Sequence, residues 1–355
     1  MTMLIAATEL KHALKKLSPI KSDTYQLGQG VSAQDSEAWV VEEAGFSFSP
    51  ANVNGKKLTQ VVNRMSGQIK IEQEERKLIL ESARAKIELE IQPVKPLTPP
   101  KTSDQFLKLR NADFKPLLQI ATSFVSSNKS ADFGYKVQIH SLPLGLEDET
   151  PPGYRVVGSD GNTLAILTNM AEIPFEFKYL LNLTAASVVQ LMDGSDLEIG
   201  ETNQNVWVRS GSTTVFASKP HQVYPEYQRF IPPSFGLKLQ FNPEDLSAAL
   251  RTVEPLIEEE TDNGAVALLY ADGVLECRNV GIGETASDKC SCEQIDPDPV
   301  FDPKEIRFKV NSKYLTQFLS KVSGAVTLSY NTPLTPLKFE SGKFTAIVSP
   351  MGKKQ

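Results

Sequence analysis

The residues most able to carry out catalysis are few, and they form no known catalytic pattern. The three histidines, His12, His140 and His221, lie at no metal-ligand spacing from a carboxylate or a cysteine. Ser159-Asp160-Gly161 lacks the Gly-x-Ser-x-Gly pattern of a nucleophile elbow, and no Gly-x-x-x-x-Gly-Lys-Ser/Thr phosphate loop is present. The sequence therefore predicts no catalytic residue, no enzymatic activity and no cofactor.

The three cysteines, Cys277, Cys290 and Cys292, are the remaining candidates for chemistry. Their odd number and their clustering give no disulfide framework, which is typical of a reducing compartment. Cys290-x-Cys292 together with Cys277 could hold a soft metal ion, but a Cys-x-Cys pair in a charged loop is a weak signal. We expect no metal site.

The composition is that of an ordinary globular protein. Of the 355 residues, 40% are hydrophobic and 23% are charged, and the formal net charge is −6. No apolar run approaches the length of about 18 residues that a membrane span needs, and no signal peptide is evident, so we expect a cytoplasmic protein. The negative charge argues against a protein that coats nucleic acid through its overall charge, but it leaves room for a local basic surface.

Three stretches of the chain repeat one another. Residues 61–67 read Val-Val-Asn-Arg-Met-Ser-Gly, residues 188–194 read Val-Val-Gln-Leu-Met-Asp-Gly, and residues 318–324 read Phe-Leu-Ser-Lys-Val-Ser-Gly. Each stretch predicts a helix closed by a C′ glycine. A proline follows 26 residues after the glycine in all three copies, at Pro93, Pro220 and Pro350. Such internal repeats predict a repeated domain.

Further elements surround each repeated helix. Three strand-like runs follow each glycine: 69–72, 77–81 and 87–91; 197–199, 206–209 and 214–217; 326–330, 337–340 and 344–348. A second helix, with cap and acidic signals at its start, is predicted ahead of each copy, near residues 8–17, 111–121 and 242–253. Asp-Gly turns predict hairpins around residues 160–161 and 272–273.

The fold class follows from this order of elements. Proline-rich segments near residues 93–100 and 231–233 read as linkers. They divide the chain into three predicted domains, 1–98, 103–232 and 236–355. Each domain has two helices that pack on antiparallel sheets, which is an α+β arrangement.

Three segments resemble the bacterial DNA polymerase III β sliding clamp family. Residues 157–165, Val-Gly-Ser-Asp-Gly-Asn-Thr-Leu-Ala, are similar to the family's Thr-Asp-Gly-His-Arg-Leu-Ala segment. Ser218-Lys219 followed by residues 224–232, Tyr-Pro-Glu-Tyr-Gln-Arg-Phe-Ile-Pro, resembles its Lys and Phe-Pro-Asp-Tyr-Arg-Arg-x-Leu-Pro segments. Residues 348–351, Val-Ser-Pro-Met, resemble its terminal Met-Pro-Met. The resemblance covers nearly the whole chain and is weakest over residues 18–50.

The resemblance implies a non-catalytic processivity factor in DNA replication. In that family a head-to-tail homodimer closes into a ring, helices line a central channel for double-stranded DNA, and no base sequence is read. The ring tethers the replicative polymerase, and the clamp loader and other partners also bind it through short peptide motifs. The alternative is a monomeric clamp-like protein-binding module that no longer forms a ring.

The resemblance also implies three sets of site residues. The partner peptide-binding pocket would comprise Ser159, Gly161, Asn162, Thr163, Leu164, Pro225, Arg229, Phe230, Ile347, Val348, Ser349, Pro350 and Met351. The DNA channel would carry Lys11, Lys15, Lys16, Lys56, Lys57, Arg64, Lys115, Arg251, Lys313 and Lys321, with Lys11, Lys15 and Lys16 opposite the leucine face of the first helix. The dimer interface would pair Ile87 and Leu89 with Leu256 and Ile257.

Simpler interpretations of these residues stay open. Lysines on solvated helix faces are common, Ile347 fits a buried strand as well as a pocket wall, and residues 86–91 alternate as any half-buried strand does. The sequence also departs from the family, because Asn162-Thr163 stands where the family has His-Arg and Ser349 stands where it has Met. We therefore expect a diverged clamp whose pocket prefers its own peptide motif.

Overall fold

The computed structural model describes residues 2–45, 47–93, 98–126, 135–142, 152–219, 224–257, 264–281, 283–296 and 306–351. His221 lies outside these ranges. Contacts divide the chain into two compact units, which we describe one at a time. The first unit comprises residues 1–122, 136–152 and 172–222, and the second comprises residues 123–135, 153–171 and 223–355.

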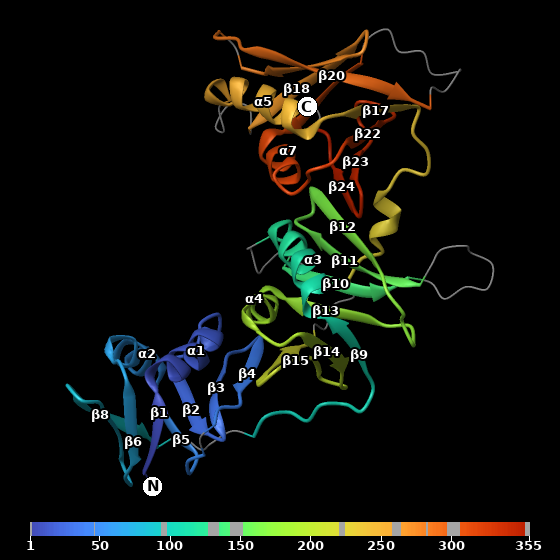
Figure 1. Cartoon of the computed structure of the whole chain (residues 1–355). Helices are drawn as coiled ribbons and strands as arrows, with labels where there is room; N and C mark the ends of the chain where they lie inside the picture. The colour runs from blue at the N-terminus through green and yellow to red at the C-terminus, as the bar shows by residue number, and fades with distance from the viewer. Residues whose placement is uncertain are drawn as a thin grey trace. The chain divides into compact units, whose positions relative to one another are not determined.

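The first unit begins with one complete repeat. Its helices are α1 (Ala7–Leu17) and α2 (Gly55–Arg64), which lie side by side against the strands (Figure 1). Leu10, Leu14 and Leu17 are buried along one side of α1, as the helical spacing predicts. The strands are β1 (Thr2–Ala6), β2 (Thr24–Gly28), β3 (Gly30–Gln34), β4 (Ala38–Glu42), β5 (Ala51–Asn54), β6 (Gln68–Gln73), β7 (Lys77–Glu81) and β8 (Lys86–Gln92).

Part of a second repeat completes the first unit. It has α3 (Asn111–Ser123), α4 (Leu183–Leu191), β9 (Phe106–Arg110), β10 (Lys136–Ser141), β13 (Lys178–Asn182), β14 (Asp196–Glu201), β15 (Asn205–Ser210) and β16 (Thr213–Ser218). β10 pairs with β13. The other strands join those of the first repeat in one antiparallel sheet, in the order β1-β6-β7-β8-β5-β2-β3-β4-β16-β15-β14-β9. The first repeat therefore meets the second where β4 pairs with β16.

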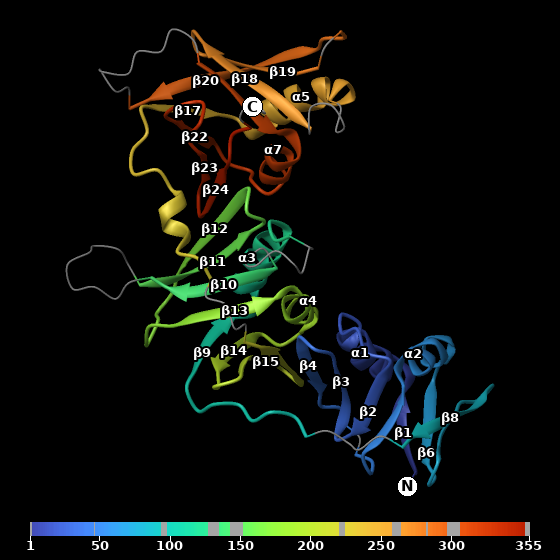
Figure 2. The same cartoon turned by 180° about the vertical axis from the view of Figure 1, so that it is seen from behind.

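The second unit is built in the same way. Figure 2 shows α5 (Pro243–Val253) and α7 (Ser312–Leu319) beside its sheet. The strands are β11 (Gly153–Ser159), β12 (Thr163–Met170), β17 (Leu237–Phe241), β18 (Ala265–Ala271), β19 (Val274–Asn279), β20 (Ser287–Ile295), β21 (Ile306–Asn311), β22 (Val326–Tyr330), β23 (Leu337–Ser341) and β24 (Phe344–Val348). Their order is β11-β12-β24-β23-β22-β17-β20-β19-β18-β21.

The repeated helix followed by three strands is confirmed in all three copies. α2, α4 and α7 each precede a three-stranded meander: β6-β7-β8, β14-β15-β16 and β22-β23-β24. The prediction that a C′ glycine ends each helix is wrong. α2 ends before an extended Met65 and α4 before an extended Met192, each two residues ahead of its glycine, and α7 ends at Leu319, five residues ahead of Gly324.

Close packing explains the glycine of the second copy. A Cβ atom at Gly194 would lie 2.5 Å from Oγ of Ser210 and 2.6 Å from the backbone nitrogen of Gly211. The carbonyl oxygen of Gly194 accepts a hydrogen bond from Nδ2 of Asn111 at 2.6 Å. Glycine is therefore needed where the helix-to-strand turn touches the β15–β16 hairpin.

No helix in the described part of the chain is both long enough and apolar enough to span a membrane.

Candidate functional site

The predicted pocket is assembled on two strands that come from different repeats. β12 and β24 pair antiparallel, with Leu164 opposite Ile347 and Thr163 opposite Val348. The pairing continues past the strand ends, because the backbone nitrogen of Ser349 donates to the carbonyl oxygen of Asn162 at 2.9 Å. A register set by these bonds fixes which side chains reach the same face of the sheet.

The floor of the pocket is a small apolar cluster. It consists of Val157, Leu164, Ile166, Tyr227 and Ile347, all less than 9% exposed. Tyr227 comes from the short helix η1 (Tyr227–Phe230), which crosses this face of the strands. Above the floor lies a hollow of about 550 Å³, counted to its open mouth. The apolar floor and the open mouth suit the side chains of a short peptide.

Most of the predicted pocket residues do line this hollow. They are Ser159, Gly161, Asn162, Thr163, Leu164, Pro225, Phe230, Ile347 and Ser349. Tyr224, Tyr227 and Pro336 also line it and were not in the predicted set. The two tyrosines lie within the segment that resembles the family, so that segment carried the signal. Pro336 comes just before β23 and has no local signal.

Four predicted pocket residues do not line the hollow. Val348 is fully buried beneath it. Arg229 is exposed and pairs with Glu226 at 2.5 Å, so its charge lies at the surface. Pro350 and Met351 are half-buried, and the backbone of Met351 donates to the carbonyl oxygen of Lys309 at 2.8 Å.

The turn at the pocket rim is held by its own side chains. Oδ1 of Asp160 accepts hydrogen bonds from the backbone nitrogens of Asn162 and Thr163, at 2.9 and 2.7 Å. Oγ of Ser159 donates to the carbonyl oxygen of Thr163 at 2.6 Å. Gly161 has a φ of +93°, which a side chain would strain. The rim is therefore set before any partner arrives.

The two pocket tyrosines stay protonated at neutral pH. Burial raises the pKa of Tyr224. Burial also raises the pKa of Tyr227, although a hydrogen bond from Arg155 acts in the opposite direction. Nη1 of Arg155 lies 3.3 Å from the hydroxyl of Tyr227. The pocket thus offers neutral aromatic surface, with a cation behind Tyr227.

The cations predicted to face DNA fall into two groups. Those exposed to solvent are Lys15, Lys56, Lys57, Arg64, Arg251, Lys313 and Lys321. Lys11, Lys16 and Lys115 are half-buried or buried instead. The helical spacing of the sequence could not separate the two groups, because burial depends on what packs against each helix.

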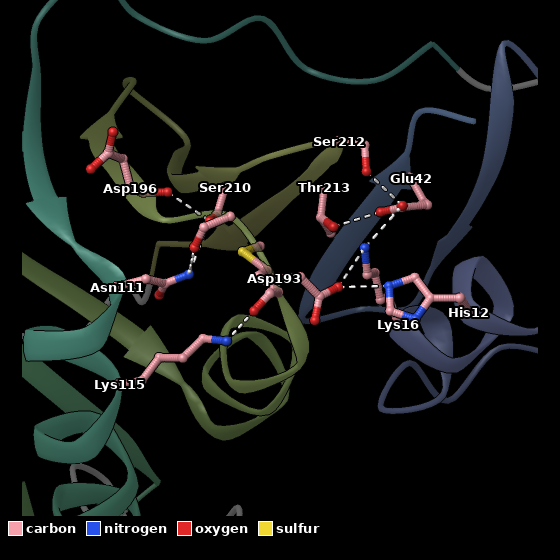
Figure 3. Close-up of polar contacts among 12 residues, drawn as sticks. His12, Lys16, Glu42, Asn111, Lys115, Asp193, Asp196, Ser210, Ser212 and Thr213 are labelled. Carbon is pink, nitrogen blue, oxygen red and sulfur yellow. Dashed lines mark hydrogen bonds and ion pairs between the residues drawn. The ribbon is translucent and has the colours of Figure 1, made fainter. Parts of the chain in front are cut away.

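Lys11 and Lys115 occupy equivalent places in two repeats. Nζ of Lys11 donates to the carbonyl oxygen of Met65 at 2.8 Å, where α2 ends. Nζ of Lys115 donates likewise to the carbonyl oxygen of Met192, where α4 ends (Figure 3). A lysine at the C-terminal end of a helix donates to a carbonyl oxygen that has no partner within the helix, and its positive charge interacts favourably with the helix dipole. Burial lowers the pKa of Lys115, an effect that the nearby charge of Asp193 opposes.

The prediction that Lys16 faces DNA is wrong. Its side chain is 5% exposed, and its ammonium group lies 3.0 Å from Oε1 of Glu42 and 3.1 Å from Oδ2 of Asp193 (Figure 3). Glu42 also accepts hydrogen bonds from the hydroxyls of Ser212 and Thr213, at 2.7 and 2.5 Å. Lys16 therefore joins α1 to the β4–β16 junction and is not available to a phosphate.

His12 extends this charged cluster to the surface. Its Nε2 lies 2.6 Å from Oδ2 of Asp193, and both side chains are more than half exposed. Burial alone would raise the pKa of Asp193, but hydrogen bonds from Lys16 and His12 outweigh it, and the pKa lies below its usual value. Asp193 follows α4, so the cluster ties α1 to the second repeat.

The cysteines lie in strands, so the prediction of a charged loop is wrong. Cys277 is in β19, and Cys290 and Cys292 are in β20. Burial raises the pKa of both Cys277 and Cys290 to about 12 and that of Cys292 to about 11. Such thiols are protonated at neutral pH and are poor nucleophiles. Within the described ranges, no three His, Cys, Asp or Glu side chains are grouped to hold a metal.

Two strands have free edges: β8, which holds two of the predicted interface residues, and β20, which was not predicted to take part. Residues 86–90 of β8 pair only with β7, since β5 reaches only Ile91 and Gln92. Residues 287–291 of β20 pair only with β19, since β17 reaches only residues 292–295. In the described chain, each stretch therefore has a row of backbone groups with no strand partner.

The four predicted interface side chains lie on or near these edges. Ile87 is half-buried and Leu89 is 8% exposed, both on β8. Leu256 and Ile257 are half-buried just after α5, and α5 packs against β20.

Comparison with solved structures gives one consistent answer about the fold. The chain is similar to the DNA polymerase III subunit β of Pseudomonas aeruginosa, with 16% identity and a TM-score of 0.84, and to that of Thermotoga maritima, with the same values. It is also similar to the pol III β of Caulobacter crescentus, with 15% identity and a TM-score of 0.85. Each match covers 99% of this chain and 100% of the other.

The comparisons made by sequence found no match for this chain. No protein-family model matches it, and no curated protein matches it. The backbone nevertheless follows that of the solved relatives from end to end. The chain therefore has the fold of the DNA polymerase III β subunit, the bacterial sliding clamp, with three repeated domains.

Proposed function

We propose that this protein is a sliding clamp, a ring of two copies that encircles duplex DNA and tethers a polymerase to it. The observation that carries the proposal is the match in fold over 99% of the chain to proteins described as sliding clamps. The three repeats account for the whole of that fold, with predicted domains at residues 1–98, 103–232 and 236–355. The tether would act in the cytoplasm and would catalyse nothing itself.

The strand pairing inside the chain supports closure of the ring. At each of the two internal junctions, the fourth strand of one repeat pairs with the last strand of the next: β4 with β16, and β12 with β24. By the same rule, two strands have no partner in a neighbouring repeat of the described chain. They are β20, the fourth strand of the third repeat, and β8, the last strand of the first repeat. Pairing β8 of one copy with β20 of another would satisfy both free edges, and two such contacts close a symmetric dimer.

The pocket supports a role in binding partners. Its apolar floor and its exposed rim residue Phe230 suit a short peptide that inserts one or two apolar side chains. Asn162 and Ser349 at the rim are small and polar, so the preferred peptide would differ from one adapted to larger rim side chains. A polymerase and a clamp loader that carry such a peptide are the expected partners.

A topological assay tests the proposal directly. The protein would be loaded onto nicked circular DNA by a bacterial clamp loader and separated from free protein at high salt. We expect it to stay on the circle and to leave when a restriction enzyme linearises the DNA, because a ring is held by topology and not by contacts. Retention on linear DNA, or no retention on circles, would count against a clamp.

Mass in solution separates the ring from the alternative of a monomeric binding module. The chain mass is 39.1 kDa, so the ring predicts a stable species of twice that value. The case for a monomer began with the weak resemblance over residues 18–50. There the structure has β2, β3 and β4 in full, so the first repeat lacks no element of the ring-forming fold. A strict monomer at micromolar concentration would still favour the alternative.

A further inference from the structure

The exposed positive charge of the helices is unevenly shared among the repeats. Seven of the predicted channel cations are exposed, and four of them, Lys15, Lys56, Lys57 and Arg64, belong to α1 and α2. The second repeat contributes only Lys115, which is half-buried and bonded to a backbone carbonyl. The third repeat holds the other three, Arg251, which α5 offsets with Glu244 and Asp245, and Lys313 and Lys321, which lie in and just after α7.

α2 is the most cationic of these helices. Its buried side holds Leu58 and Val62. Its exposed side presents Lys56, Lys57, Gln60, Asn63 and Arg64, with no acidic residue in the helix. Lysine, arginine, glutamine and asparagine are among the side chains that contact the phosphates of DNA.

The two lysines of α2 lie where a positive charge does not stabilise the helix. Lys56 and Lys57 lie in its first turn, and no acid accompanies them there. The first turn is the positive end of the helix dipole, where acidic side chains stabilise and cations do not. No ion pair of Lys56, Lys57 or Arg64 is found in the described part of the chain. Charge that the fold does not neutralise is available to a ligand.

α4 is the opposite case. It reads Leu-Thr-Ala-Ala-Ser-Val-Val-Gln-Leu and carries no charge. Its exposed and half-exposed positions are Leu183, Ser187, Gln190 and Leu191. α3 adds one acid, Asp113, which pairs with Arg110 at 2.7 Å, and one base, Lys115. Of the described elements, the two helices of the second repeat, α3 and α4, therefore offer a phosphate almost no free charge.

We infer that α2, assisted by Lys15 of α1, makes the main phosphate contacts of this protein and that α3 and α4 make none. The inference rests on the proposed function, since it concerns the duplex that a clamp would encircle. Lys56 and Arg64 are eight residues apart, which is about 12 Å along a helix. At about 3.4 Å of duplex axis per phosphate of one strand, that span covers three to four phosphate steps, so the cations at the two ends of α2 would reach different phosphates.

The salt dependence of DNA binding tests the inference. Each phosphate that a protein neutralises adds about 0.9 to the slope of log affinity against log salt concentration. The triple variant Lys56→Gln, Lys57→Gln, Arg64→Gln should lower the slope by about 2.7 on a fluorescently labelled duplex, measured by anisotropy. Lys115→Gln should leave the slope unchanged.

A matched control removes one charge without touching the helices. Lys70 lies in β6 between buried Ile69 and Ile71, so its side chain points away from the helices, and it pairs with Glu72 at 3.3 Å. Lys70→Gln should keep the full slope. Folding is checked by thermal melting, and the lysine changes in the first turn of α2 should not lower the melting temperature.

The outcomes separate the two ideas. A wild-type protein that binds no duplex at any salt concentration would overturn this inference alone, because a ring held by topology needs no such contacts and the proposed function is tested by retention on circular DNA. If the wild type binds and Lys115→Gln costs a third of the slope that the triple variant loses, the inference is overturned. The same loss for Lys70→Gln would also overturn it, because it would show an effect of net charge alone.

Discussion

Lys16 is the residue whose surroundings differ most from the solvent exposure that its residue type predicts. A lysine beside Lys15 on a helix looks solvated in the sequence, yet the Lys16 ammonium is enclosed by Glu42 and Asp193. Removing one partner of a buried ion pair typically costs about 3–5 kcal/mol, because the other charge stays buried without compensation. We expect Lys16→Met to lower the free energy of unfolding by about 3 kcal/mol in urea titrations.

The neighbouring lysine supplies the control for that measurement. Lys15 is exposed and Lys15→Met should change the stability by no more than about 0.5 kcal/mol. If the two variants unfold at the same urea concentration, the buried pair does not hold the β4–β16 junction.

Asp193 makes the stability that this charged cluster contributes depend on pH. Its folded pKa is lowered, because the hydrogen bonds from Lys16 and His12 outweigh the effect of burial. A carboxylate with a lowered pKa stabilises the fold above its unfolded pKa, and that stability disappears as the pH falls through the folded pKa. The gap in melting temperature between wild type and Asp193→Asn should therefore be full at neutral pH and close in acid. A gap that widens in acid would contradict this account.

The contribution of the pocket to peptide binding can be tested at the short helix η1, which carries the rim residue Phe230. Phe230 is 55% exposed at its rim, and a peptide that covers this ring gains apolar contact. Phe230→Ser should weaken short peptides selected on the wild type from a displayed library by about tenfold, from the lost apolar burial. Leu334 is 78% exposed and does not line the hollow, so Leu334→Ser is the matched control. Equal affinities for both variants would place the binding site elsewhere.

The elements that sequence predicted best are those whose signal is local. The meanders after each repeated helix were found because apolar alternation and the Gly-to-Pro spacing recur three times. β2 and β3, Thr-Tyr-Gln-Leu-Gly and Gly-Val-Ser-Ala-Gln, were missed because they are short, polar on alternate positions and joined through a tight turn. Their place in the sheet is fixed by pairing with β5 and β4, which no local pattern records.

The residues of the candidate site also fall into those that a local motif predicts and those that only the folded chain brings together. Leu164, Phe230 and Ile347 could be named from motifs, because each motif supplies its own wall of the pocket. Pro336 could not, because it reaches the hollow only through the pairing of β23 with β24. The burial of Lys16 was equally beyond reach, since Glu42 and Asp193 come to it from distant parts of the chain.

At the scale of the whole molecule, two internal junctions share a strand pairing but differ in chemistry. The β4–β16 junction ends on the carboxylate of Glu42, which Lys16, Ser212 and Thr213 surround. The β12–β24 junction ends on Leu167 opposite Phe344, whose ring packs against Phe318 and Phe124. The fourth strand of one repeat therefore pairs with the last strand of the next at both junctions, although the side chains at the two junctions differ. A third junction between copies needs only free edges and compatible side chains.

That third junction gives the last prediction. Ile87 lies on the free edge of β8, where a charge would be buried by β20 of a second copy. We expect Ile87→Asp to convert a dimer of twice 39.1 kDa to a monomer in sedimentation equilibrium, with no loss of peptide binding at the pocket, which belongs to other strands. Leu334→Asp, at an exposed turn that belongs to neither β8 nor β20, should stay dimeric. A dimer that survives Ile87→Asp but dissociates in Leu334→Asp would place the interface between copies at another surface, and the pairing of β8 with β20 would be wrong.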